Sequence, residues 1–147
     1  MSPGRPMKVR WSGLMLTGIL CCGATLPAAS GPAVELELDR TAPRAVEEQT
    51  ARAIVRDYGA AWLALSQALE QSRPQPLGDL WTGFAKQQVL DAISRQQASG
   101  VRVHYADQGH KLEAVFYSPE GSALELHDTA TVERRIMDGD KVITSDR

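Results

Sequence analysis

The sequence predicts an α+β fold, in which N-terminal helices pack on a curved antiparallel sheet. Between residues 43 and 99, apolar side chains recur with the spacing of helices. After Gly100 the spacing changes to two, which is typical of strands with one buried and one wet face. Helices and strands are therefore segregated along the chain, and this order favours the α+β class.

The first 30 residues have the three parts of a secretory signal peptide. Arg5, Lys8 and Arg10 make the start basic, WSGLMLTGILCCGATL is uncharged and mostly apolar, and PAAS supplies small residues. Ala28 and Ser30 suit the cleavage rule, so we expect the cut near Ser30 and a periplasmic or secreted protein. The alternative is an uncleaved anchor, although a spanning helix needs about 20 apolar residues and this run is shorter.

Both cysteines, Cys21 and Cys22, lie in the segment to be removed. Ile19 and Leu20 precede them where a lipoprotein signal has small residues, so a lipid anchor is not expected. The mature chain would contain no thiol, and hence no disulfide, cysteine metal site or thiol nucleophile.

The charge balance excludes two classes of partner. The chain has 16 basic and 18 acidic side chains, and loss of the three basic ones in the signal segment leaves 13 against 18. The densest basic stretch, ERR at residues 133–135, itself contains an acid. Nucleic acids and anionic membranes require concentrated positive charge, so we expect neither as a partner; the membrane is met only through the signal segment before cleavage.

Residues 31–42 form a leader in which Val34, Leu36 and Leu38 alternate with acidic residues. This alternation is compatible with an edge strand or with an unpaired leader, and the sequence leaves both open.

A long helix is predicted over residues 45–72, with Thr41 as its cap and Pro43 in its first turn. Its apolar face contains Ile54, Tyr58, Ala61, Trp62, Leu65 and Leu69. The stretch RPQP ends it. A short helical turn follows at residues 77–81, then a break at Thr82-Gly83 and a second helix. That helix buries Ala85, Val89, Leu90 and Ile93 and ends at Gly100.

Three long strands and a hairpin tail follow Gly100. The strands are VRVHYADQ, HKLEAVFYS and SALELHDTATVERRI, with SPEG as the turn before the third. Asp138-Gly139 predicts a further hairpin into DKVITSDR. In the third strand the expected core face is Leu124, Leu126, Ala130, Val132 and Ile136. In the strand before it, Leu112, Ala114 and Phe116 are expected to point inward and Tyr117 outward.

Asp128 breaks this pattern, because it falls on the inward set between Leu126 and Ala130. It is turned out by a bulge, paired with a helix residue, or placed in a pocket where a carboxylate can act as a general base. The aromatic residues Tyr58, Trp62 and Trp81, with Phe116, are candidate pocket walls; the alternative is ordinary core packing.

The three histidines lie six and seventeen residues apart, spacings that match no metal motif. We expect His104 and His127 on the outer face and His110 at a turn, as surface or hydrogen-bonded structural residues. The sequence also lacks a nucleophile elbow, a phosphate loop, a dinucleotide fingerprint and an HExxH motif. No metal and no cofactor are therefore expected.

The order of a long helix, LWTGFAKQQVLDAI and long strands joined by short hairpins resembles the nuclear-transport-factor-2-like superfamily, including SnoaL-like and IMS-type domains. Leu80–Ala85, LWTGFA, is close to the helical L-x-G-x-A stretch of these proteins. The resemblance covers residues 43–143 and implies a cone-like, cystatin-like or SnoaL-like arrangement around a cavity. It also implies a final long strand, which this sequence reaches only in part.

These observations lead to one expected function and two alternatives. We expect residues 43–147 to form a single domain that binds a small apolar ligand or a protein partner without catalysis. The alternatives are an isomerase- or hydrolase-like enzyme that uses Asp128, with Tyr58 as a hydrogen-bond donor, and a structural module that assembles as a homodimer through an open sheet edge.

Overall fold

The computed structural model of the chain describes residues 31–147. The expected signal peptide, its cleavage site near Ser30 and the two cysteines lie outside the described residues. No helix among residues 31–147 combines the length and the apolar character that a bilayer crossing requires.

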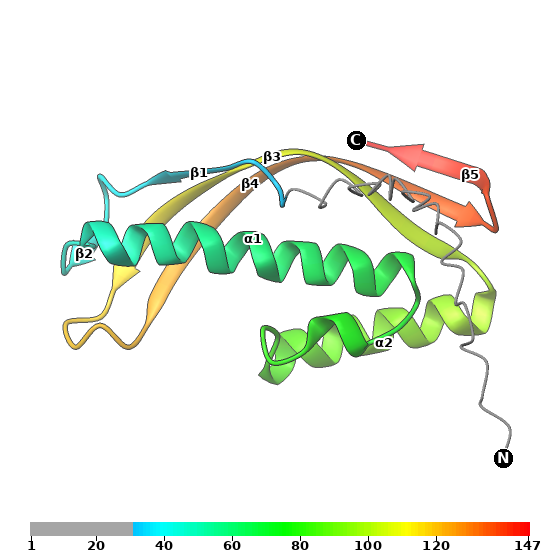
Figure 1. The fold of residues 1–147 in the computed structure, drawn as a ribbon, viewed down its shortest axis with the longest axis horizontal. Coiled ribbons are helices and arrows are strands. Elements are labelled where there is room, and N and C mark those ends of the chain that lie inside the picture. The colour runs from blue at the N-terminus through cyan, green and yellow to red at the C-terminus, as the bar shows by residue number, and fades with distance from the viewer. Residues whose placement is uncertain (1–30) are drawn as a thin grey trace, which may run out of the picture.

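The described chain is α+β, as predicted, with helices on one side of a bent sheet (Figure 1). In chain order its elements are β1 (Val34–Glu37), β2 (Ala42–Pro43), α1 (Glu48–Glu70), the 3-10 helix η1 (Gln75–Leu77), α2 (Gly83–Ser99), β3 (Arg102–Tyr117), β4 (Leu124–Asp138) and β5 (Lys141–Asp146). The sheet order is β1-β3-β4-β5, with β2 also beside β3. The sheet is mixed, whereas the sequence predicted an antiparallel one, because β1 and β2 run parallel to β3.

The leader forms edge strands. Residues 34–37 pair with residues 110–113 of β3, which resolves the alternative left open by the sequence. Thr41 and Pro43 do not start the helix, as their positions had suggested. The Thr41 hydroxyl donates to the Ala114 carbonyl oxygen at 3.0 Å, and Pro43 pairs with Tyr117. Because Thr41 and Pro43 are bound to β3, α1 begins only at Glu48, with Glu47 at its cap.

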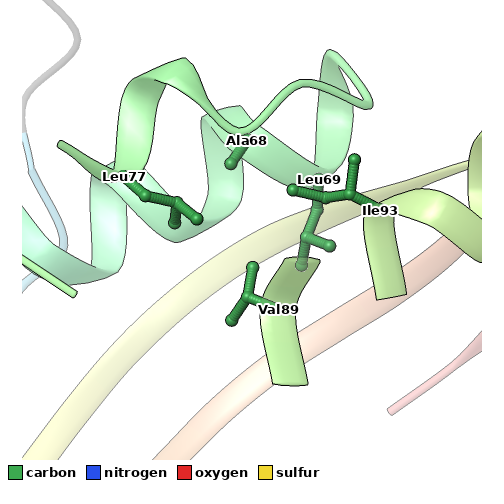
Figure 2. Close-up of a cluster of buried hydrophobic side chains, with 5 residues drawn as sticks. All are labelled: Ala68, Leu69, Leu77, Val89 and Ile93. Atoms are coloured by element: carbon green, nitrogen blue, oxygen red, sulfur yellow. The ribbon is translucent and has the colours of Figure 1, made fainter. Parts of the chain in front are cut away.

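An apolar cluster joins the two helices, as Figure 2 shows. It contains Ala68 and Leu69 of α1, Leu77 of η1, and Val89 and Ile93 of α2. The predicted break at Thr82-Gly83 is confirmed, and Gly100 ends α2 with a φ of 72°, a left-handed conformation that glycine adopts without strain. Ala85, which was expected in the buried stripe, is exposed because it lies in the first turn of α2, before the cluster.

The first two predicted strands are one strand. β3 runs unbroken through Gly109, where the sequence suggested a turn, and its register with β4 shifts between Asp107 and Gly109. Gly109 has a φ of 138°, and its N–H donates to the Asp107 side chain at 2.7 Å. An extra residue is therefore absorbed as a β-bulge, which bends the strand instead of ending it.

A second bulge overturns the prediction for Phe116. The register shifts again between Ala114 and Phe116, so the alternation of faces reverses beyond Ala114. Tyr117 points inward and is buried, whereas Phe116, expected inward as a pocket residue, is 40% exposed. Leu124 and Leu126 pair with Tyr117 and Ala114 on the inner face, as predicted. Both hairpins also form where the sequence placed them.

Candidate functional site

The polar centre of the molecule is a histidine inside the sheet. His110 lies in the middle of β3, with its side chain fully buried, and not at a turn. The bulge at Gly109 keeps it in line with the inward residues before it: because one extra residue is absorbed there, His110 shares the inner face with Val103 and Tyr105 as well as with Leu112 and Ala114. On that face it meets α1.

Both ring nitrogens of His110 face carboxylates. Nε2 lies 3.1 Å from Oδ2 of Asp107, three residues earlier on β3. Nδ1 lies 3.0 Å from Oδ2 of Asp128 on β4. Asp128 therefore stays on the inward face, as the sequence indicated, and it pairs with a helix residue rather than being turned out by a bulge. The Tyr58 hydroxyl of α1 donates to Asp128 Oδ2 at 2.6 Å.

This cluster, Tyr58, Asp107, His110 and Asp128, is called here the polar network. The Tyr58 oxygen is also 2.9 Å from His110 Nδ1, from which it can accept. An ionised carboxylate only accepts hydrogen bonds, so His110 satisfies both acids by donation only when both of its nitrogens carry protons. Even then the network contains two acids against one cation. It is a half-buried site with an excess of negative charge.

Burial raises the pKa of the Tyr58 hydroxyl, and the hydrogen bond and negative charge of Asp128 raise it further. Ionisation would place a phenolate against two carboxylates in a partly dry site, which is costly. Tyr58 is therefore a neutral donor at physiological pH. It links α1 to the two central strands.

Two aromatic rings close the network on one side. The Trp62 ring centroid is 4.4 Å from that of His110 and 5.7 Å from that of Tyr105, in edge and tilted arrangements respectively. Such contacts add to the burial of apolar area. The buried Trp62 Nε1 has no hydrogen-bond acceptor among residues 31–147.

The structure brings together three of the five predicted site residues: Tyr58, Trp62 and Asp128. Trp81 lies elsewhere, where it donates from Nε1 to the Ala61 carbonyl oxygen at 2.9 Å and packs against the apolar cluster. Phe116 points away, as described above.

Sequence reasoning missed His110 and Asp107. The pattern Asp-x-Gly before His110 was the available indication, because a short acidic side chain can cap the N–H of a glycine two residues on. Once the strand is seen to continue through Gly109, alternation back from Leu112 and Ala114 places His110 inward.

A hollow of about 450 Å³ opens beside the network, between α1 and the β3–β4 hairpin. Its apolar lining includes Ile54 and Ala61 of α1 with Leu124 and Leu126 of β4. Tyr58 and Tyr117 supply the phenol groups at its wall. The volume falls in the range of small-molecule sites, which are mostly apolar with a few polar groups.

No group of three or more His, Cys, Asp or Glu side chains is arranged to hold a metal ion within residues 31–147. In the polar network the ligand-type atoms contact one another instead of converging on a common point. The network is thus suited to holding elements together and to placing negative charge.

No known family model, curated protein or solved structure matches this chain. What the chain does must therefore be inferred from its own residues.

Proposed function

We propose that this protein is an exported, non-catalytic domain that binds a small apolar ligand in the hollow between α1 and the β3–β4 hairpin. The observation that carries the proposal is the pairing of an open apolar hollow with polar groups that are already engaged. We further propose that the bent sheet and its helices form the cone-like arrangement of the nuclear-transport-factor-2-like superfamily.

The state of Asp128 supports binding over catalysis. A general base needs a lone pair directed at a substrate proton. Oδ2 of Asp128 accepts from Tyr58 and lies 3.0 Å from His110, and Oδ1 lies 3.2 Å from the same ring. Asp128 is thus held by Tyr58 and His110 and is not among the residues that line the apolar hollow, which fits a positioning role.

The shape of the hollow supports an apolar ligand. α1 offers Ile54 and Ala61 from one side, and β4 offers Leu124 and Leu126 from the other. Removal of apolar surface from water stabilises a complex by about 25 cal/mol per Å². The hydroxyl groups at the edge, Thr50 and Ser122 among them, can orient a polar end of the ligand.

A fluorescent apolar probe, N-phenylnaphthylamine, tests the hollow directly. We expect saturable binding that the Leu126→Trp variant weakens about tenfold, a change of about 1.4 kcal/mol, because the larger ring fills the space. Val142→Trp, on the exposed strand β5, is the matched control and should bind like the natural chain. Equal affinity in both variants would place the probe elsewhere and contradict the proposal.

The Asp128→Asn variant tests whether binding in the hollow needs the charge of this carboxylate. We expect probe affinity within twofold of the natural chain, because asparagine can still accept the Tyr58 hydrogen bond. A folded variant that no longer binds the probe would show that Asp128 contacts the ligand, which contradicts the positioning role proposed for it. Mass spectrometry of native protein from the cell envelope would show a retained ligand and the mature amino terminus together.

A further inference from the structure

A second hollow, of about 440 Å³, borders the polar network at Asp107, whereas the apolar hollow borders it at Tyr58. It is bounded by residues 31–33, by the α1 residues Trp62 and Glu70, and by the β3 residues Tyr105 and Asp107. β1 pairs only with residues 110–113, so the earlier part of β3 has a free edge here. The hollow therefore lies where the leader enters the fold.

The lining has the chemistry of a cation site. It contains two carboxylates, Glu70 and Asp107, and the rings of Trp62 and Tyr105, but no lysine or arginine. Asp107 belongs to the polar network, where one imidazole faces two acids. Negative charge and aromatic faces both attract an ammonium group.

Glu70 also borders a neighbouring hollow with Arg102, His104 and Arg135, whereas no lysine or arginine lines the present one. Glu70 lies 3.1 Å from Nδ1 of His104, yet its side chain is 53% exposed. The Asp107 side chain is 20% exposed, and His110 is its partner from within the sheet. One further cation would balance the group of acids.

Gly31 is held at this hollow. The Ala33 carbonyl oxygen accepts from the His110 N–H at 2.9 Å, which ties the leader to β3. A Cβ at Gly31 would come within 4.0 Å of the Gly59 carbonyl oxygen of α1, so the backbone passes close to that helix. Gly31 and Asp107 both line this hollow, so the start of the described chain and this carboxylate face the same space.

We propose that cleavage after Ser30 turns the nitrogen of Gly31 into an ammonium group that binds in this hollow, between the carboxylates of Glu70 and Asp107. The inference rests on the proposed export, because it requires removal of the signal peptide. An export peptidase hydrolyses the Ser30–Gly31 bond with one water, which leaves a carboxylate on Ser30 and an amine on Gly31. That amine takes up a proton at neutral pH, since the ordinary pKa of an α-amino group is about 8.

Removal of the signal peptide then also changes the charge at this edge of the sheet. Before cleavage the Gly31 nitrogen is a neutral amide, and afterwards it is the cation that the acidic hollow lacks. The new charge fastens β1 to α1 and β3 beside the polar network. The mature form is therefore held more tightly at this edge than the precursor.

The test uses native protein purified from the cell envelope, whose amino terminus is first identified by sequencing. The rate at which the terminal amine is acylated is then followed by peptide mass spectrometry across pH. Neighbouring carboxylates raise the pKa of the amine, so we expect acylation at pH 7 to be about threefold slower than in the denatured chain. The titratable and charged groups around this amine are Glu70, Tyr105 and Asp107 in the lining, Arg102, His104 and Arg135 beside Glu70, and His110 beside Asp107.

Charge-removing variants locate the effect. We expect Glu70→Gln to speed acylation about twofold, because one of the two facing charges is lost. Glu125→Gln is the matched control: Glu125 is also an exposed acid beside a histidine, His127, but it lies on β4. Asp107→Asn should act like Glu70→Gln if it folds, and Glu70→Gln alone decides the point if it does not.

The outcomes separate the two proposals. A terminus at Gly31 whose reactivity equals that of the denatured chain overturns the ammonium site and leaves export standing. A terminus at another residue overturns the site for the natural protein, and an uncleaved start at Met1 also contradicts export with cleavage. Slow acylation that Glu70→Gln relieves and Glu125→Gln does not supports the inference.

Discussion

Two regions of this molecule hold its elements together by different means. The apolar cluster of Ala68, Leu69, Leu77, Val89 and Ile93 is dry, and it joins α1, η1 and α2 (Figure 2). The polar network joins the middle of α1 to β3 and β4 through four side chains that share their hydrogen bonds. The apolar cluster excludes water, whereas the polar network places ionisable side chains beneath α1.

The difference shows that one region supplies stability and the other fixes the position of a helix. Apolar contacts are non-directional, so they stabilise the helical end without constraining which atoms meet. Hydrogen bonds to charged groups depend on distance and angle, so the network specifies the position of α1 over the sheet. Both proposed binding hollows border the network rather than the dry cluster.

The largest expected effect comes from the dry region. Leu77 is fully buried, and Leu77→Ala should lower the free energy of unfolding by about 3 kcal/mol because it leaves a cavity. Leu80→Ala is the control, since Leu80 is 53% exposed and should change the value by less than about 0.5 kcal/mol. Chemical denaturation of both variants checks this, and equal losses would show that η1 does not seal the cluster.

Replacement of His110 in the polar region should cost less. His110→Leu removes both donors and leaves Asp107 and Asp128 facing an apolar side chain. We expect a loss of about 2 kcal/mol, because the acids are partly exposed and water can replace some of the lost bonds. His127→Leu, on the exposed outer face, should have little effect. A loss equal to that of Leu77→Ala would mean that the network also carries most of the packing.

The smallest effect is a dependence on alkaline pH. The pKa of Tyr58 is raised above the ordinary 10.0, so the folded chain holds this proton more tightly than the unfolded chain. The stabilisation is fully present below pH 10 and is lost as the pH rises through the folded value. Ultraviolet titration should show a phenol that ionises above the ordinary value of 10.0. The Tyr58→Phe variant should lack that step and lose stability less steeply above pH 10; an unchanged titration curve would contradict this.

Much of the fold could be predicted because it depends on neighbours in sequence. The helical spacing of Tyr58, Leu65 and Leu69, the break at Thr82-Gly83 and the two hairpins all follow from contacts within a few residues. The inward position of Asp128 followed from simple alternation along β4. The extra residues of both β3–β4 bulges lie on β3, so the faces of β4 are unchanged.

The candidate site could be predicted only in part. Tyr58, Trp62 and Asp128 do lie together, but nothing local joins them to His110, which lies 52 residues after Tyr58. Phe116 failed because one bulged residue reverses the face of every residue beyond it.

The sequence by itself determined the class, the presence of the two helices, the two hairpin turns and the alternation of wet and apolar faces between bulges, since these arise from backbone preferences and short-range periodicity. Only the tertiary structure decided that β1 runs parallel to β3, where the two bulges fall, and that one histidine lies between two acids. Those features depend on contacts between distant segments, and their energies appear only when the segments are brought together.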